Sequence, residues 1–224
     1  MAMYFVFMGP PGSGKSTMAK KLVEEYGLAH FSTGDIIREK IAKDKKFKEM
    51  FEGLIKEGKL LDDENTKKLL LEKLKQSKIE NGFILDGYPR TVKQAEDLGS
   101  ILAELNAKLD LVVYFRLSES AAVERLSNRL YCPKCSKVYN LASVKPKKEG
   151  ICDDCGSELK VRADDMPEAI IKRFREYEDK TKPLLQHYKK KGLLKEIDVD
   201  DEVDANYKKI KSVVEQVKKK KRKK

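Results

Sequence analysis

The segment GPPGSGKST (residues 9–17) constrains the fold of this chain more than any other part of its sequence. It follows the apolar run MYFVFM (3–8) and precedes a stretch, 15–26, in which apolar residues recur at helical spacing. A short apolar run is typical of a buried parallel strand, and Gly27 is a helix stop signal. A glycine-rich turn between a strand and a helix, ending in Gly-Lys-Ser, is the context of a phosphate-binding P-loop.

The residue types of this turn suit phosphate chemistry. Gly12 and Gly14 let backbone N–H groups curl around phosphate oxygens, because no side chain obstructs them. The helix that starts near Gly14 adds its positive end, and Lys15 brings a charge to the terminal phosphates. The hydroxyl of Ser16 can reach a Mg²⁺ ion. Asp86 ends an apolar strand, where a P-loop protein needs a carboxylate near that metal.

Apolar strands alternate with helical patterns along the chain, which predicts an α/β domain around a parallel sheet. Further strands are expected within residues 28–35, 83–86, 109–117 and 193–198. Helical patterns cover residues 36–41, 45–80 with a break at 58–64, the segment from Ser118 through Arg129, 167–190 and the C-terminal part. No apolar run approaches the roughly 20 residues that span a bilayer, and the start lacks a signal-peptide pattern. We expect a cytoplasmic protein with no membrane partner.

Positive charge is concentrated at the C-terminus. The net charge is +11, and the last seven residues, KKKKRKK (218–224), carry seven positive charges, which leaves +4 for the other 217 residues. A block of like charges is typically disordered and solvated. We therefore expect a disordered basic tail over 218–224 and no nucleic-acid partner apart from non-specific contact by this tail.

The four cysteines form two pairs, Cys132-x-x-Cys135 and Cys152-x-x-Cys155, with sixteen residues between them. This spacing matches a Cys₄ zinc site of the ribbon type, in which each tight turn supplies two thiolates. Two disulfides are the alternative, but an intracellular location favours zinc. Four thiolates leave no open position, so we expect one structural Zn²⁺ per chain, which stiffens a segment too small to build its own core.

Four further motifs share their order and spacing with one known family. They are STGDIIR (32–38), GKLL (58–61), LDGYPRT (85–91) with Gln94, and VRADDMPEAIIKR (161–173). With the P-loop they resemble adenylate kinases over nearly the whole chain, and the cysteine segment resembles the zinc-bearing lid of the long form. The resemblance implies a five-stranded parallel sheet flanked by helices, a helical NMP-binding flap and a mobile Cys₄ zinc lid. It also implies the Mg²⁺-dependent reaction ATP + AMP ⇌ 2 ADP, with these nucleotides as partners of a monomer or small homo-oligomer.

The same resemblance implies domain boundaries. The core P-loop domain would comprise residues 1–31, 62–127 and 166–217, with the flap at 32–61 and the lid at 128–165. Closure of flap and lid over both nucleotides would keep water from competing as the phosphoryl acceptor. Glycines at which these segments could bend are Gly53, Gly58 and Gly150.

Site residues carried over from the family form three groups. The ATP-binding group comprises Gly12, Ser13, Gly14, Lys15, Ser16, Thr17, Arg129, Val138 and Tyr139. The AMP-binding group comprises Thr33, Arg38, Lys59, Leu60, Leu61, Gly87, Tyr88, Pro89, Arg90, Gln94, Arg162 and Arg173. The catalytic group comprises Lys15, Arg90, Arg129, Arg162 and Arg173, with Ser16 and Asp86 holding Mg²⁺ directly or through water.

The chemistry of the residues agrees with phosphoryl transfer between phosphates. An acceptor phosphate oxygen is already ionised at neutral pH, so no general base is needed, only concentrated positive charge and in-line positioning. The chain has two histidines, His30 and His187, and neither lies in a catalytic setting. Arginines instead accompany the motifs, and Arg forks suit phosphate oxygens. Arg125 and Arg129 are four apart, which predicts a shared helix face.

Two departures from the family leave questions open. Ser16 stands where adenylate kinases commonly have glycine, so its hydroxyl is a candidate direct ligand of Mg²⁺. Val199 stands where the family usually has glycine beside the donor base, which leaves the donor-base preference open. Two other functions compete: a UMP/CMP-type or broad-specificity nucleoside monophosphate kinase, and a nucleic-acid-associated P-loop ATPase with a zinc ribbon. Thr33 and Gln94 favour adenine, because UMP/CMP-type relatives often have alanine at the position of Thr33.

Overall fold

A five-stranded parallel sheet forms the centre of the molecule. The computed structural model describes residues 1–57 and 59–223, with the side chains of 54–56 left undescribed. The strand order is β2-β3-β1-β4-β7, and all neighbouring pairs run parallel. The strands are β1 (Met3–Met8), β2 (Ala29–Ser32), β3 (Gly82–Asp86), β4 (Leu111–Arg116) and β7 (Leu194–Asp198). This confirms the predicted sheet.

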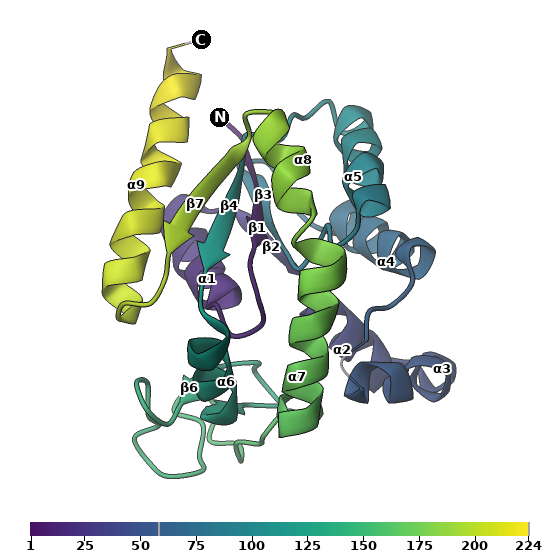
Figure 1. Cartoon of the computed structure of the whole chain (residues 1–224), viewed down its shortest axis with the longest axis vertical. Helices are drawn as coiled ribbons and strands as arrows, with labels where there is room; N and C mark the ends of the chain where they lie inside the picture. The colour runs from purple at the N-terminus through teal and green to yellow at the C-terminus, as the bar shows by residue number, and fades with distance from the viewer. Residues whose placement is uncertain (58, 224) are drawn as a thin grey trace.

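Helices cover both faces of the sheet (Figure 1). They are α1 (Lys15–Tyr26), α2 (Thr33–Lys43), α3 (Lys45–Lys56), α4 (Asp63–Gln76), α5 (Val92–Glu104), α6 (Glu119–Ser127), α7 (Pro167–Glu176), α8 (Leu184–Lys190) and α9 (Val203–Arg222). Alternate residues of β1 face the two layers: Val6 and Met8 pack with α4, α5 and α8, while Phe5 and Phe7 pack with α1 and α9. Burial on both faces explains why the strands read as continuous apolar runs.

Side-chain caps fix where the helices start. Ser32, Asp62, Thr91 and Ser118 each accept a hydrogen bond from the backbone N–H three residues further on. At the other end of α1, Gly27 adopts φ 64° and its N–H donates to the carbonyl of Val23. The parallel register, in which Phe7 and Ser32 both pair with Asp86, places the carboxyl ends of β1, β2 and β3 together, with the P-loop directly after β1. That edge of a parallel sheet is where ligands bind in open α/β folds.

Two segments extend beyond this edge (Figure 1). One carries α2 and α3. The other contains a two-stranded antiparallel sheet of β5 (Arg129–Tyr131) and β6 (Val138–Asn140), followed by the short helix η1 (Ala163–Asp165). Gly58, named as a bending point, lies outside the described residues. No helix in the described part of the chain is long and apolar enough to cross a membrane.

Three sequence predictions about helices were wrong. The expected single helix over 167–190 is divided into α7, a π-helical turn η2 (Tyr177–Thr181) and α8. Arg129 does not share a helix face with Arg125, because α6 ends at Ser127 and Arg129 begins β5.

The third concerns the basic segment 218–224, which was expected to be disordered. Its residues up to Arg222 continue α9 instead. Lys221 anchors this end: its Nζ donates to the carbonyl of Ala2 at 2.6 Å and lies 2.7 Å from Asp110. Lys218 lies over the ring of Tyr26. Contacts distant in sequence therefore hold part of the run, and Lys224 lies outside the described residues.

Substitution of Gly82 by alanine should strongly destabilise the fold. Gly82 has φ +90°, and a Cβ atom there would lie 2.0 Å from the carbonyl oxygen of Met3 on β1. The substitution would separate the first residues of two central strands, so we expect a loss of roughly 2–4 kcal/mol in the free energy of unfolding. Urea denaturation of both proteins measures it.

Gly99→Ala is the matched control. Gly99 is exposed on α5, and apart from its chain neighbours and the nearby backbone of its own helix, no atom lies within 4 Å of the place that an alanine methyl group would take. Alanine should therefore stabilise the protein by about 0.5–1 kcal/mol through helix propensity. A Gly82→Ala protein as stable as wild type would contradict this explanation of the strand pairing.

Candidate active site

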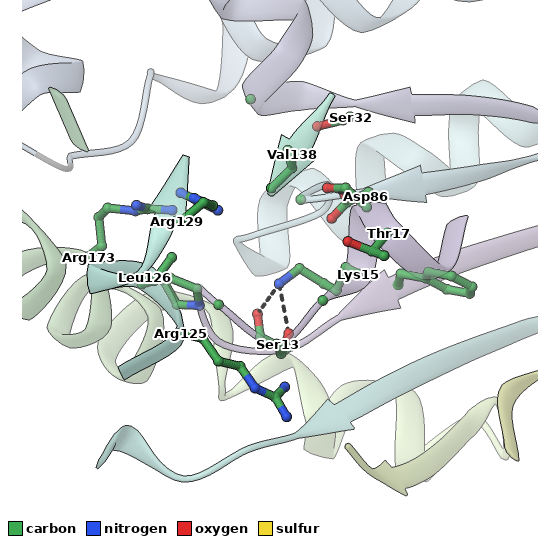
Figure 2. Close-up of a pocket in the computed structure, with 18 of the residues that line it drawn as sticks. Ser13, Lys15, Thr17, Ser32, Asp86, Arg125, Leu126, Arg129, Val138 and Arg173 are labelled. Atoms are coloured by element: carbon green, nitrogen blue, oxygen red, sulfur yellow. Dashed lines mark hydrogen bonds between the residues drawn. The ribbon is translucent and has the colours of Figure 1, made fainter. Parts of the chain in front are cut away.

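A cavity of about 590 Å³ opens at the carboxyl edge of the sheet. The P-loop, α2, the loop after β3, β6 and α7 all contribute to its wall. Figure 2 shows Lys15, Asp86, Arg129 and Arg173 around it. No histidine is among the described residues that line this cavity. The groups gathered here are thus cations, hydroxyls and carboxylates from segments far apart in the sequence.

Lys15 is held inside the P-loop. Its Nζ donates to the Ser13 hydroxyl at 3.1 Å (Figure 2). It also donates to the carbonyls of Gly9 and Pro10, both at 2.9 Å. Gly12 and Gly14 make the curl possible, with φ of 80° and 81°. Burial lowers the pKa of Lys15 to about 8; Asp86 opposes this shift, and the charges of nearby arginines add to it. A bound anionic ligand would favour the charged ammonium group and so raise the pKa of Lys15.

Asp86 ends β3 and is 4% exposed. The Ser16 hydroxyl donates to Asp86 Oδ2, and His30 Nε2 lies 3.6 Å from the same oxygen. Burial opposes ionisation of Asp86, but His30, Lys15 and Ser16 together lower its pKa to about 2. The carboxylate is therefore ionised, beside a hydroxyl, at the foot of the P-loop. Sequence reasoning did not assign His30; its only signal was its place on the strand that pairs with β3.

Buried carboxylates position the arginines. Asp165 has a fully buried side chain and accepts two hydrogen bonds from Arg129, at 2.5 and 2.6 Å, and one from Arg173 at 2.9 Å. Burial and the charge of Arg173 lower the pKa of Arg90 to about 10. Burial and the charge of Arg129 likewise lower the pKa of Arg162 to about 10. Arg173 also lies 3.1 Å from Asp164, and Arg38 pairs with Asp35. In and behind the cavity wall, four carboxylates (Asp35, Asp86, Asp164 and Asp165) thus accompany Lys15 and the five arginines Arg38, Arg90, Arg129, Arg162 and Arg173.

Arg125 is not part of this arginine cluster. Its guanidinium donates to the carbonyl of Val199 at 2.7 Å and points away from Arg129 and Arg173 (Figure 2). Val199 is buried and lines the cavity at the end of β7.

Asp165 is a functional residue that sequence reasoning missed, although it lies within the motif at 161–173.

Polar groups on the opposite wall come from the STGD and DGYPR motifs. The Thr33 hydroxyl donates to the carbonyl of Gly87 at 2.7 Å, and Arg90 Nε donates to the same carbonyl at 2.7 Å. Gln94 is buried between Arg90 and Asp63, with hydrogen bonds of 2.7 Å to each. Asp63 was not predicted as a site residue, because the sequence placed it in the expected break at 58–64, whereas the structure makes it the first residue of α4.

The structure brings nearly all the predicted nucleotide residues to this one cavity. Of the predicted P-loop, arginine, flap and strand-end residues, all of which the structure describes, only Tyr88 does not line it. The Tyr88 side chain is buried in the core instead. Lys59 lines the cavity and pairs with Glu57 at 2.9 Å. Val138 and Tyr139 line it from β6.

Comparisons with known proteins agree with this arrangement. The family model for adenylate kinase matches residues 7–193. An adenylate kinase of Fervidobacterium nodosum is 45% identical over 88% of this chain and 90% of its own length. One of Thermosipho melanesiensis is 42% identical over 95% and 99%, and one of Archaeoglobus fulgidus is 40% identical over 96% and 100%. The chain belongs to the adenylate kinase family.

Membership of the adenylate kinase family implies Mg²⁺ bound with ATP, and the residues present fit that ion. Mg²⁺ takes oxygen ligands and is usually held by one or two carboxylates or hydroxyls together with substrate phosphates. Ser16 and Asp86 supply two such oxygens in mutual contact, directly beside the P-loop. The family match favours neither of the competing functions over adenylate kinase.

The four cysteines fit a zinc ion. Their Sγ atoms all lie within 4.8 Å of one another, with 3.3 Å between Cys132 and Cys155 and 3.5 Å between Cys135 and Cys152. Tetrahedral Zn–S bonds of about 2.3 Å would place the sulfurs about 3.8 Å apart, close to these distances. The four thiols are free, so the disulfide alternative does not hold in this structure.

Ionisation of the cluster also favours a cation. Burial opposes ionisation of Cys152, but hydrogen bonds from the Tyr139 hydroxyl and from backbone N–H groups lower its pKa to about 6. A hydrogen bond from the Lys137 backbone favours the Cys135 thiolate, yet burial and the neighbouring thiols raise its pKa to about 12. Without a metal ion, the four sulfurs therefore do not all ionise at neutral pH.

Affinity for ATP should fall as the pH rises through about 8. In the free protein Lys15 is protonated below its pKa of about 8 and neutral above it, and bound phosphates raise that pKa. Binding above this pH therefore takes up a proton, and Kd should rise by up to about tenfold per pH unit. Calorimetric titration from about pH 7 to 9.5, in two buffers of different ionisation enthalpy, measures the affinity and the proton uptake.

Lys15→Arg is the control, because guanidinium stays protonated throughout this range. Its Kd should depend little on pH. A wild-type Kd that stays constant across the range, without proton uptake, would contradict the role given to Lys15.

Proposed function

We propose that this member of the adenylate kinase family transfers the terminal phosphoryl group of ATP to AMP, reversibly giving two ADP. The observation that carries the proposal is the convergence of Lys15 and the arginine cluster on one cavity. That cavity lies between the P-loop on one side and Thr33 and Gln94 on the other. A donor triphosphate and an acceptor monophosphate would meet at the cations between these walls.

The chemistry needs these groups and no general base. The acceptor phosphate oxygen is ionised at neutral pH, so catalysis depends on in-line positioning and on stabilising charge spread over the transferred group. Lys15, Arg90, Arg129, Arg162 and Arg173 supply that charge. Mg²⁺ held near Ser16 and Asp86 would neutralise phosphate charge when bound with ATP. We propose the P-loop with Val138 and Tyr139 as the donor site.

The acceptor site would be formed by the opposite wall, from Thr33, Arg38, residues 59–61, the loop after β3 and Gln94. The segments 32–61 and 128–165 would act as flap and lid around a core of 1–31, 62–127 and 166–217. Both segments contribute residues to the cavity wall, which supports closure over the substrates. Closure would exclude water, the competing acceptor.

One structural Zn²⁺ per chain would hold the lid together. The lid's own buried cluster comprises Cys132, Tyr139, Cys152 and Leu159, too few groups for an independent core. Thiolate ligation requires reducing conditions, which supports a cytoplasmic location. Free ATP, AMP and ADP are the proposed partners.

An assay of ADP formation tests the proposed function. Wild-type protein is given ATP with AMP, UMP, CMP or GMP, each with and without Mg²⁺. We expect ADP to form with Mg²⁺ and kcat/KM to be highest for AMP, because Thr33 and Gln94 form a polar wall for the base. Higher activity with UMP or CMP would favour the pyrimidine-kinase alternative. No activity with any monophosphate would overturn the proposal.

Replacement of Ser16 by glycine tests direct ligation of Mg²⁺. Since the Ser16 hydroxyl contacts Asp86, its loss should remove one metal oxygen ligand and raise the Mg²⁺ concentration for half-maximal rate several-fold. Ser16→Thr keeps a hydroxyl and should retain the wild-type dependence. Mn²⁺ binding in the presence of ATP, followed by electron paramagnetic resonance, measures ligation directly. An unchanged Mg²⁺ dependence in Ser16→Gly would show that the hydroxyl does not ligate the ion.

A further inference from the structure

We propose that Asp63 fixes the orientation of the Gln94 amide and thereby makes the acceptor site select bases with an amino group over bases with a carbonyl group. The inference rests on the proposed function and goes beyond it, because it assigns the selection to a residue outside the cavity wall. Gln94 lies in the first turn of α5 and is 2% exposed. Its Oε1 accepts from the backbone N–H of Arg90 at 2.7 Å, and its Nε2 donates to Asp63 Oδ1 at 2.7 Å.

Each of the two hydrogen-bond partners of the Gln94 amide can play only one role, as donor or as acceptor. A backbone N–H can only donate, and an ionised carboxylate can only accept. Rotation of the amide by half a turn would place Oε1 against the Asp63 oxygen and the Nε2 hydrogens against the Arg90 N–H. Both hydrogen bonds would become repulsive contacts at a buried site. The two neighbours therefore leave Gln94 one orientation.

Asp63 is itself held in place. It is the first residue of α4, directly after the N-cap Asp62. Its second oxygen accepts from the Thr91 hydroxyl at 3.0 Å. Thr91 in turn caps α5, the helix that carries Gln94. The carboxylate thus connects the start of α4 to the start of α5 and cannot turn away without breaking that connection.

The fixed amide determines what the base meets. One lone pair of Oε1 and one hydrogen of Nε2 remain uncommitted, an acceptor beside a donor. Thr33, on the same cavity, has its hydroxyl hydrogen committed to Gly87 and offers only lone pairs. The adenine edge presents an amino donor beside a ring-nitrogen acceptor, which complements this wall. Hypoxanthine presents a carbonyl acceptor beside an N–H donor, the reverse pattern, and would need the amide turned.

AMP and IMP differ only at this edge, so they separate selection from size. In Asp63→Asn the new amide can face Gln94 with either its oxygen or its nitrogen, which allows both orientations of Gln94. We expect the ratio of kcat/KM for AMP over IMP to fall roughly tenfold, with the Arg90 N–H still opposing the turn. Glu64→Gln is the matched control. Glu64 is the exposed next residue on α4, and its substitution should leave the ratio unchanged.

The outcomes distinguish selection from mere support. If Asp63 only stabilises the helix starts, Asp63→Asn will lower activity on AMP and IMP alike, and an unchanged ratio overturns the inference. Asp63→Ala, measured in parallel, should also lower the ratio, and equilibrium binding of AMP and IMP to both variants should show the same change. If the wild-type protein forms no ADP from ATP and AMP, the proposed function is overturned instead. If the wild-type protein is active but Asp63→Asn keeps the wild-type ratio of kcat/KM for AMP over IMP, only this inference is overturned.

Discussion

Concentrated positive charge in a buried cavity is the constraint on which the rest of this structure depends. Five cationic groups that repel one another lie at the carboxyl edge of the sheet, and burial makes each ion more costly than it would be in water. The protein offsets this with few carboxylates. Asp165 is shared by Arg129 and Arg173, and Asp86 lies beside Lys15 and Ser16. The residual positive charge is what an adenylate kinase needs, because bound phosphates complete the neutralisation.

Crowded ionisable groups also determine the structure of the cysteine-containing lid, but there they are thiols, which become negatively charged, instead of cations. Four thiols lie within 4.8 Å, and their pKa values diverge because hydrogen bonds among the sulfurs favour the Cys152 thiolate and keep Cys135 protonated. A bound divalent cation would let all four sulfurs ionise and would supply the stability that a small segment cannot obtain from apolar burial. Tyr139 joins the two regions: it lines the nucleotide cavity, and its hydroxyl lies 3.6 Å from Cys152. The cysteine cluster is thereby connected to the wall of the nucleotide cavity.

The sequence predicted what is encoded locally. The P-loop, the five strands and the helix stop at Gly27 depend on residues within a few positions, and the structure has them where expected. The missed features depend on distant partners. Asp63 contacts Gln94 across 31 residues, and Lys221 reaches Asp110 and Ala2 from the far end of the chain. No local pattern marks a carboxylate that acts on an amide in another helix, or a lysine run whose members have partners near the first strand.

The break between α7 and α8 shows why such a feature matters to the site. Helical periodicity continues through 177–181, yet the chain forms a π-helical turn that brings the Thr181 hydroxyl to the carbonyl of Arg90 at 3.2 Å. The N–H of Arg90 holds Gln94, and its Nε shares the carbonyl of Gly87 with Thr33. One arginine therefore connects the Gln94 amide, the end of β3 and the arginine cluster. In the proposed acceptor site, a base that fits badly would disturb the backbone of Arg90, and this would couple base selection to phosphoryl transfer.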